Sequence, residues 1–453
     1  MTRPEPMDAY EYLYRKVVYP AYERLRGRRT FDYVREYEAN EGLSADALAA
    51  LQWTKLRALL EHCQQNVPYY RRLWSGIGAD WRDIRSLDDF ALLPVLTKDH
   101  IRESYQELVA SNWRGRTLRK STGGSTGQPL TLEYTRESYE RRTAVAMRGY
   151  AWAGARQGMR TVYVWGGDVA PVPRWQKLKT AAHLRAVRRT MLNSFYLSRD
   201  NAAGYIERLN RARPDVVVGY TQPLYNLARH ALEHGLPVWR PKTVITGSEA
   251  LLEFQREEIS RAFCAPVFNT YGCREFMLLA SECGRHEGLH VNTDHVVLEL
   301  GSADCAGTGA VTVTDLHNYG MPFIRYVNGD LATPLAGRCA CGRAFPRLAR
   351  VDGRVSDTIR TRDGRMLPGQ FFPHLLKEFR GILRYQVVQR REGDLVIRIV
   401  RGADFDPGAL PRIESELRKV LGPDLPVHYD FVPEIPLTAT GKHRVTVSEM
   451  AAP

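Results

Sequence analysis

STGGSTGQP, residues 121–129, is the strongest local signal in the sequence. Its three glycines and four hydroxyl residues leave a backbone whose NH groups can approach phosphate oxygens, with Ser and Thr hydroxyls as further donors. The segment lacks the Gly-Lys-Ser/Thr ending of a Walker loop, and it does not open a helix as a dinucleotide-binding fingerprint should. Because a glycine-rich surface linker would look similar, the neighbouring sequence has to decide between the two interpretations.

Beyond this segment, β-branched runs alternate with amphipathic stretches. The runs are TVYVWGG (161–167), DVVVGY (215–220), TVITGSE (243–249) and PVFNTYG (266–272), and each ends in glycine or a turn-forming residue. This alternation predicts an α/β fold with parallel βαβ sheets, in which ligands bind beyond the carboxyl ends of the strands. Further strands between Val291 and Leu331 predict an antiparallel or barrel-like extension.

The two ends of the chain have different patterns. Residues 8–74 repeat apolar and aromatic side chains at helical spacing, with one good helix expected over residues 48–63. NVPYYRRLW (66–74) and LLPVLTKDH (92–100) are expected to be irregular connections. Residues 381–435 predict two strands around a turn, a helix and a further strand. We therefore expect a large domain of residues 1–355, helical over 1–90, and a small mobile α+β lid domain of residues 356–453.

Composition narrows the classes of partner. The 453 residues include 64 Lys and Arg against 51 Asp and Glu, a formal charge of +13, which suits nucleic acid, a membrane surface or anionic small substrates. The basic residues lie in short groups interrupted by acids, so neither nucleic acid nor a membrane is expected. The beginning of the sequence lacks the apolar core of an export signal, and seven cysteines do not suggest a disulfide framework. We expect a soluble, cytoplasmic protein.

Four further motifs follow STGGSTGQP in order: YGCRE (271–275), RYVNGD (325–330), GRVSD (353–357) and LTATGKHR (437–444). Over residues 90–445 this set resembles the adenylate-forming superfamily. The short N-terminal part and the Cys-containing insertion resemble its phenylacetate-CoA ligase branch, which includes relatives from polysaccharide gene clusters. The resemblance implies an AMP-forming acid-thiol ligase. In such an enzyme a carboxylic acid attacks the α-phosphorus of ATP, pyrophosphate leaves, and the acyl or aryl group passes from AMP to coenzyme A.

Two alternatives stay open. One is the same adenylation with an amine acceptor, as in an amide synthetase. The other is a catalytically silent nucleotide-binding relative, supported by Arg274, where the family has Thr or Ser, and by Ser356 at the position of the family's hinge acid. The identity of the acid and the oligomeric state are also open, with a homodimer among the options.

The resemblance also implies roles for individual residues. Glu275 would help to hold Mg²⁺, Asp330 would accept hydrogen bonds from both ribose hydroxyls, and Lys442 would bridge the carboxylate and the α-phosphate after domain closure. Arg325 is expected as a further catalytic cation. The expected nucleotide contacts are Ser121, Thr122, Gly123, Gly124, Ser125, Thr126, Gly127, Ser248, Glu249, Asn269, Tyr271, Gly272, Asp330 and Arg354. The acyl pocket is expected near Trp165, Tyr220 and Phe276, although aromatic residues at such spacing more often belong to a core.

Cysteine and histidine residues suggest a metal site. Cys339-Ala-Cys341 lies just before the expected domain boundary, and a C-x-C pair needs a third and a fourth ligand from elsewhere in the chain. Cys283 and His290 are the favoured partners, with His286 as the alternative fourth ligand. Three Cys and one His make a closed tetrahedral zinc site, and some members of the resembled branch carry such a zinc. The other interpretation is a pair of free thiols in the glycine-rich turn GRCACGR.

Overall fold

The computed structural model describes residues 7–121, 130–166, 173–301, 307–354, 358–360, 366–368, 371–376, 379, 381–421, 425–436 and 444–450. Residues 122–127 of the glycine-rich segment, the hinge positions 356 and 357, and Lys442 therefore lie outside the described residues. The predicted boundary between residues 355 and 356 lies there too.

The N-terminal part is helical, as predicted. The long helix α4 begins after Ser44, whose Oγ accepts a hydrogen bond from the backbone NH of Ala47 at 3.2 Å. The helical elements of this part are α1 (Ala9–Leu13), η1 (Tyr14–Val18), α2 (Tyr19–Leu25), α3 (Thr30–Asn40), α4 (Ala45–Asn66), α5 (Pro68–Gly76), α6 (Leu87–Phe90), α7 (Lys98–Glu103), α8 (Tyr105–Leu108) and η2 (Ser111–Trp113).

The prediction of an irregular connection at residues 66–74 was wrong, because α5 occupies most of it. Pro68 stands in the first turn of this helix, where its missing NH costs nothing and its fixed φ favours helix formation. Tyr70 and Trp74 then lie one turn apart and are both buried. Proline here starts a helix instead of breaking one.

A five-stranded parallel sheet follows, and this prediction is confirmed. Its order is β4-β3-β5-β6-β7. Val217 of β5 packs into one apolar cluster and its neighbours Val216 and Val218 into another, so the sheet is covered on both faces, as parallel sheets usually are. The elements are α9 (Arg136–Trp152), β3 (Thr161–Trp165), α10 (Arg174–Ala186), β4 (Arg189–Asn193), η3 (Ser194–Tyr196), α11 (Ala202–Ala212), β5 (Val216–Tyr220), α12 (Thr221–His234), β6 (Thr243–Gly247), α13 (Glu253–Phe263) and β7 (Val267–Cys273).

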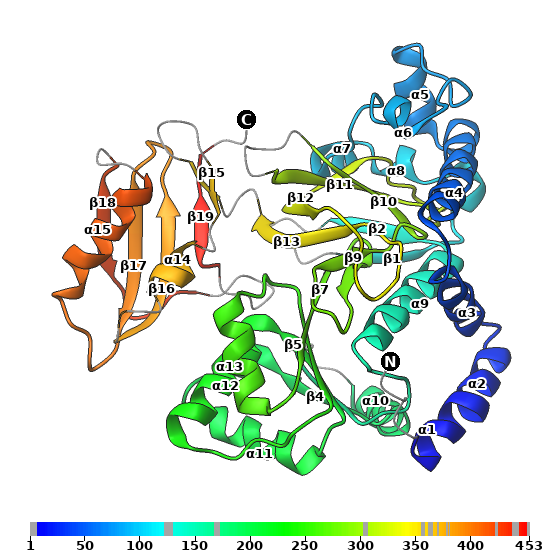
Figure 1. Ribbon diagram of the computed structural model, residues 1–453. Coiled ribbons are helices and arrows are strands. Elements are labelled where there is room, and N and C mark those ends of the chain that lie inside the picture. The colour runs from blue at the N-terminus through cyan, green and yellow to red at the C-terminus, as the bar shows by residue number, and fades with distance from the viewer. Residues whose placement is uncertain are drawn as a thin grey trace.

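Strand β7 also opens an antiparallel half, so that one sheet of 11 strands runs in the order β10-β11-β12-β13-β9-β8-β7-β6-β5-β3-β4 (Figure 1). The antiparallel character of this extension is confirmed. A closed barrel is not, since the described strands pair in an open order that ends at β10. The added strands are β8 (Met277–Glu282), β9 (Leu289–Val291), β10 (Val296–Leu300), β11 (Gly309–Asp315), β12 (Tyr326–Leu335) and β13 (Arg347–Arg354).

A separate hairpin carries the glycine-rich segment. Strands β1 (Leu118–Ser121) and β2 (Thr131–Tyr134) pair antiparallel, with Ser121 opposite Thr131. The segment thus connects two antiparallel strands, in agreement with the expectation that it does not open a helix.

The C-terminal residues form a unit with its own apolar core, drawn at the left of Figure 1. The predicted strands, helix and further strand are confirmed, and a parallel strand near the C-terminus, β19, completes a four-stranded sheet. The elements are β14 (Thr358–Arg360), β15 (Met366–Pro368), α14 (Phe371–Leu376), β16 (Ile382–Gln389), β17 (Leu395–Arg401), α15 (Ala409–Leu421), β18 (Val427–Phe431) and β19 (Thr446–Ser448). None of the described helices combines the length and the apolar content that spanning a bilayer requires.

A buried ion pair joins the N-terminal helices to the sheet. The guanidinium of Arg148 in α9 is fully buried, and its two terminal nitrogens donate to the two carboxylate oxygens of Asp294 at 2.6 and 2.8 Å. The same guanidinium donates to the carbonyl of Tyr37 in α3 and to the side chain of Asn292. A buried charge is tolerated only when it is paired and hydrogen-bonded, and here the partners come from α3 and from the segment that follows β9.

We predict that Asp294→Ala lowers the free energy of unfolding by about 3–5 kcal/mol, because it leaves the Arg148 charge buried without its counterion. Urea unfolding followed by circular dichroism measures the change. Asp83→Ala removes an exposed carboxylate and should stay within about 0.5 kcal/mol of the unmutated protein. Equal stability of the two variants would contradict a structural role for the ion pair.

Candidate active site and metal cluster

The parallel strands place the predicted nucleotide residues at one edge of the sheet. Strand β5 ends at Tyr220, β6 ends at Gly247 just before Ser248 and Glu249, and β7 leads into residues 271–275. Carboxyl ends of parallel strands are where ligands bind in open α/β sheets. The structure therefore gathers three segments that are separate in sequence at a chemically favourable edge.

Tyr271, Asn328 and Asp330 form a closed hydrogen-bonded group. The Tyr271 hydroxyl donates to Oδ2 of Asp330 at 2.8 Å, and the Asn328 amide donates to the same oxygen and to the Tyr271 hydroxyl at 2.8 Å each. The backbone NH of Asp330 donates a hydrogen bond to Oδ1 of Asn328 at 2.9 Å. Three strands separate β7 from β12 in the sheet order, so the antiparallel half must curl to make this contact.

Glu275 lies beside this group. Its Oε1 accepts a hydrogen bond from the hydroxyl of Tyr326 at 3.3 Å, and Tyr326 lies in β12 four residues before Asp330. Tyr134, at the end of β2, donates to the carbonyl of Arg274 at 3.3 Å. The strand that follows the glycine-rich segment is therefore attached to the YGCRE motif.

Sequence reasoning missed Asn328 and Tyr326 as members of the site. Both lie in the quoted segment around RYVNGD, two and four residues before Asp330. The alternation of side chains along a strand is the signal that could have found them.

The uncharged groups near the two carboxylates are held neutral. Burial, together with the nearby Asp330, raises the pKa of Tyr271 well above its ordinary value. Burial, with Glu275 and Asp330 close by, likewise raises the pKa of the Cys273 thiol. A thiol kept protonated is a poor nucleophile.

Ser248 and Glu249 directly follow β6, the neighbour of β7 in the parallel half of the sheet. One carboxylate oxygen of Glu249 accepts a hydrogen bond from the backbone NH of Gln222 at 2.8 Å, at the N-terminus of α12. Ser248 adopts a left-handed backbone conformation with φ of 71°. Together they make the turn that follows β6.

Two of the three aromatic residues expected in the acyl pocket lie at this edge. The rings of Trp165 and Tyr220 are 4.2 Å apart between centroids, at the ends of β3 and β5. The third, Phe276, is buried in the core against Phe323 and Tyr326. Burial raises the pKa of Tyr220, and the exposed Arg274 is near enough to oppose that rise.

Arg325, expected as a catalytic cation, binds Glu299 and the connection before α7 in the structure. Its guanidinium is bound to the carboxylate of Glu299, with Nε 3.1 Å from each oxygen, and to the backbone carbonyls of Ala91 and Leu93. These contacts anchor the connection before α7 to the sheet. The geometry therefore supports a structural role for this side chain.

Two further predicted nucleotide contacts lie in strands that border the site, Asn269 in β7 and Arg354 in β13. The backbone NH of Asn269, in the middle of β7, donates to Oε2 of Glu282 at 2.8 Å. Arg354 pairs with Asp330 across β12 and β13, which places it next to the ribose residue expected from sequence. Gly272 lies at a very close approach between β7 and β8, where a Cβ would meet the carbonyl oxygen of Met277 at 1.8 Å.

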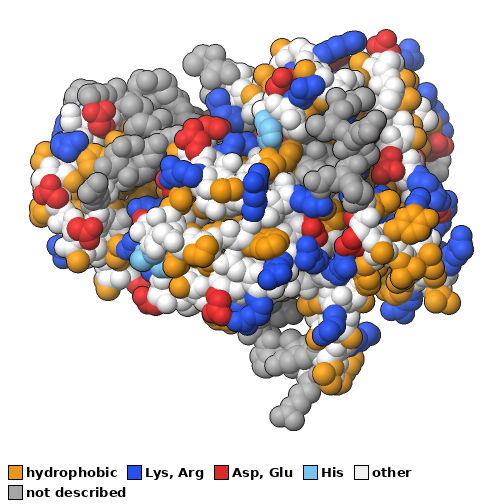
Figure 2. All heavy atoms as spheres, turned by 60° about the horizontal axis from the view of Figure 1, so that its bottom comes forward, with side chains coloured by type: hydrophobic (Ala, Val, Ile, Leu, Met, Phe, Trp, Pro, Cys, Tyr) orange, Lys and Arg blue, Asp and Glu red, His pale blue; other side chains and the backbone are white. Residues whose placement is uncertain are grey.

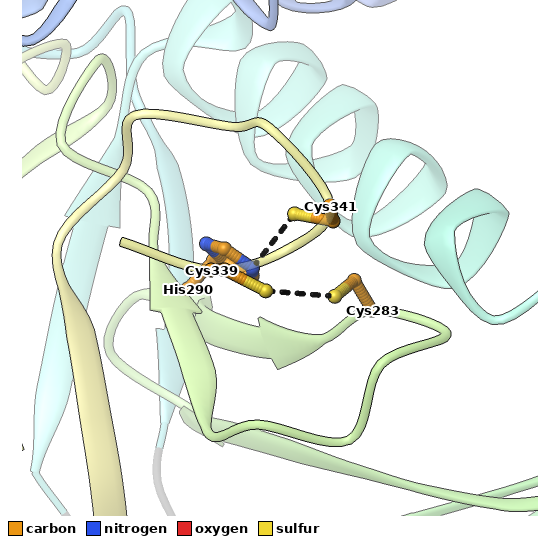
Figure 3. Close-up of side chains that lie close together, drawn as sticks. All are labelled: Cys283, His290, Cys339 and Cys341. Atoms are coloured by element: carbon orange, nitrogen blue, oxygen red, sulfur yellow. Dashed lines mark hydrogen bonds between the residues drawn. The ribbon is translucent and has the colours of Figure 1, made fainter. Parts of the chain in front are cut away.

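The four favoured metal ligands come together in the structure. The sulfur atoms of Cys283, Cys339 and Cys341 and a ring nitrogen of His290 all lie within 4.8 Å of one another. Figure 3 shows the pairs Cys283–Cys339, with 3.7 Å between sulfurs, and Cys341–His290, with 3.4 Å between Sγ and Nε2. The residues come from the β8–β9 and β12–β13 connections, apart from His290, which is in β9.

These distances fit a tetrahedral zinc ion. Zn–S bonds of about 2.3 Å and Zn–N bonds of about 2.0 Å place two sulfurs about 3.8 Å apart, and a sulfur and a nitrogen about 3.5 Å apart. Nδ1 of His290 lies 3.4 Å from the carbonyl of Phe345, which leaves Nε2 toward the sulfurs. Burial lowers the pKa of His290 to about 4, so the ring is neutral and able to bind a metal at neutral pH.

The alternative ligand, His286, lies outside this cluster. Its Nδ1 is 3.3 Å from Oε2 of Glu282, a buried carboxylate that is also paired with Arg256 at 2.7 Å. Its ring packs on Phe268 at 4.5 Å between centroids. Of the two histidines, the geometry selects His290.

Comparison with known proteins agrees with this fold. Residues 359–449 match the family model of the CapK C-terminal domain. The chain is 23% identical to Protein CapK of Staphylococcus aureus over 410 residues, covering 89% of this chain and 90% of that protein. It is 27% identical to a phenylacetate-coenzyme A ligase of Thermus thermophilus over 374 residues, covering 78% and 81%.

Comparison with solved structures supports the same fold. A 2-hydroxyisobutyryl-CoA ligase in the postadenylation state, in complex with 2-HIB-AMP, superposes with a TM-score of 0.72 at 20% identity, covering 90% of this chain and 91% of that one. An open conformation of that ligase with 2-HIB-AMP and CoA gives a TM-score of 0.61. The resemblance predicted from the five motifs is confirmed: the chain is a homologue of phenylacetate-coenzyme A ligases and of CapK, with the fold of adenylate-forming CoA ligases.

Proposed function

We propose that the protein is an ATP-dependent carboxylate ligase that forms an acyl- or aryl-adenylate, releases pyrophosphate and transfers the acyl group to coenzyme A. The observation that carries this proposal is the group of Tyr271, Asn328 and Asp330 beside Glu275, at the carboxyl edge of the sheet. This arrangement occurs in a chain related to phenylacetate-coenzyme A ligases over most of its length.

Asp330 is the proposed ribose ligand. A carboxylate can accept hydrogen bonds from two vicinal hydroxyls, and two donors on its Oδ2 fix its orientation before any nucleotide arrives. Such preorganisation lowers the entropic cost of binding. Tyr271 then acts through its hydroxyl as a positioning residue for Asp330.

Glu275 is the proposed magnesium ligand. Hard cations prefer carboxylate oxygens, and the Tyr326 hydroxyl holds Oε1 in place. When bound, the metal neutralises charge on the phosphates of ATP. The NH and hydroxyl donors of residues 122–127 are proposed to bind the β- and γ-phosphates.

Lys442 is the proposed cation between the substrate carboxylate and the α-phosphate. An ammonium on a long flexible stem suits a contact between two anions. Because this lysine belongs to the small unit, closure of that unit over the carboxyl edge is part of the proposed cycle. Coenzyme A, not an amine, is the proposed acceptor.

The cluster of Cys283, His290, Cys339 and Cys341 is proposed to hold a structural zinc ion. Four protein ligands fill a tetrahedral site, so no position is open for substrate or water. The ion would cross-link the β8–β9 and β12–β13 connections.

Asp330→Asn should reduce kcat/KM for ATP about 100-fold, because an amide cannot replace both acceptors of the carboxylate. Pyrophosphate release with a panel of aryl and acyl acids, with and without coenzyme A, measures the effect. Asp83→Ala, an exposed change, should leave the rate unaltered. If no acid led to pyrophosphate release, the protein would be the catalytically silent relative. If amines but never coenzyme A discharged the adenylate, the proposal that coenzyme A is the acceptor would be wrong.

Lys442→Ala should abolish adenylate formation to within about 1% of the unmutated rate, since it removes the cation expected to stabilise the charge that develops on the α-phosphate. Single-turnover formation of the adenylate is the measurement. Lys179→Ala, an exposed lysine of α10, serves as the matched control. Full activity of the Lys442 variant would show that the final motif has been misassigned.

The purified protein should contain about one equivalent of zinc by elemental analysis. Cys339→Ser should lower this to less than half and lower the melting temperature, whereas Cys264→Ser, which changes an exposed thiol, should alter neither. Replacement by cobalt should give the intense thiolate charge-transfer absorption of a sulfur-rich tetrahedral site. Metal-free protein of unchanged stability would contradict the zinc site.

A further inference from the structure

Exposed apolar side chains gather at one corner of the molecule, where α1, η1 and α2 lie beside α10 (Figure 1). On α10, Trp175 is 66% exposed and Leu178 is 72% exposed, although large apolar side chains are usually buried. On the N-terminal helices, Tyr12 is 56% and Leu25 is 86% exposed. We call this surface, formed by residues 8–29 and 173–186, the corner patch.

The two segments of the corner patch are held together by direct contacts. The hydroxyl of Tyr10 donates to the carbonyl of Ala186 at 2.6 Å, and the guanidinium of Arg188 lies 4.1 Å from the centre of the Tyr10 ring. The pKa of Tyr22 is lowered by a hydrogen bond from Arg26 and also by Lys179 on α10. The helices therefore form one continuous surface.

The charges on this surface are mostly positive. Residues 173–189 contain no Asp or Glu, and Lys179 and Arg185 are exposed there. Lys16 and Arg24 are exposed on the N-terminal helices. In Figure 2, Lys and Arg side chains lie among exposed hydrophobic side chains toward the right of the face shown.

The three acids of residues 8–29 do not offset these cations. Asp8 is paired with Arg188 at 2.6 Å. Glu11 and Glu23 are buried, where Glu11 pairs with Arg156 at 2.6 Å and Glu23 accepts hydrogen bonds from the backbone of Thr30 and Phe31. The outer surface of the corner patch is thus apolar and cationic.

We propose that the corner patch docks the protein on an anionic lipid surface. Helices that lie in a bilayer interface combine Trp and Leu with Lys and Arg in this way, and tryptophan favours the level of the headgroups. The scattered basic groups of the sequence, which gave no reason to expect a membrane, are brought together here by folding. The docking is peripheral and independent of the proposed catalytic activity.

A second copy of the chain fits the corner patch less well. In a two-fold dimer the same surface faces itself, so the cations of one copy would meet the cations of the other. Like charges placed together oppose association. An anionic bilayer offers opposite charge and an apolar interior at once.

Co-sedimentation with vesicles tests the proposal. The protein should bind vesicles of phosphatidylcholine with about 30 mol % phosphatidylglycerol at least about tenfold more tightly than vesicles of phosphatidylcholine alone, and added salt should weaken binding. Trp175→Ala combined with Leu178→Ala should weaken binding at least about tenfold. Arg185→Glu should weaken it about fivefold or more.

Matched controls lie elsewhere on the surface. Ile77→Ala removes an exposed apolar side chain and Arg114→Glu reverses an exposed charge, and both should bind like the unmutated protein. Circular dichroism and pyrophosphate release with soluble substrates check that each variant is folded. Equal binding to neutral and anionic vesicles, no binding to either, or a dimer that the Trp175 and Leu178 changes dissociate, would each overturn the proposal.

Discussion

The close approach of β7 and β8 at Gly272 is the constraint on which the proposed active site depends. A Cβ at this position would lie 1.8 Å from the carbonyl oxygen of Met277 and 2.9 Å from its carbonyl carbon, so only glycine lets the strands come together. The register shifts between Tyr271 and Gly272, and such bulges re-aim the side chains beside them. The positions of the residues on either side of Gly272, Tyr271 before it and Cys273 and Glu275 after it, therefore depend on a glycine at this place.

Strand β7 belongs to both halves of the sheet, parallel to β6 and antiparallel to β8. The parallel half contributes strand ends, where loops can bind a ligand. The antiparallel half curls until Asp330, in the fourth strand from β7 in the sheet order, meets Tyr271. Neither half contains the site alone. Burial, with Asp330 close by, raises the pKa of Tyr271 and of the Cys273 thiol and so keeps both groups uncharged.

Most of the architecture could be predicted from sequence, because strand and helix periodicities are local properties. The parallel strands, the antiparallel extension and the C-terminal unit are examples. What the sequence did not show depended, apart from α5, on partners distant in sequence. Nothing near Arg325 indicates that its guanidinium binds Glu299 and two carbonyls of residues 91–93. The sequence favoured His290 over His286, and the structure adds a reason for this preference: His286 contacts Glu282, which is paired with Arg256 in α13. For α5, the expectation that proline interrupts structure outweighed its preference for the first turn of a helix.

The Cys and His cluster and the proposed nucleotide site are connected by β13. His290 pairs with Arg347 at the start of this strand, and Asp330 pairs with Arg354 at its end. Seven residue steps at about 3.3 Å each separate the two places by on the order of 20 Å. A metal ion at the cluster therefore cannot touch a nucleotide bound at Asp330. Any effect of such a metal on the nucleotide site has to pass through β13, whose register with β9 the metal would fix. The metal would therefore contribute to the site only by holding in place the strands that carry it.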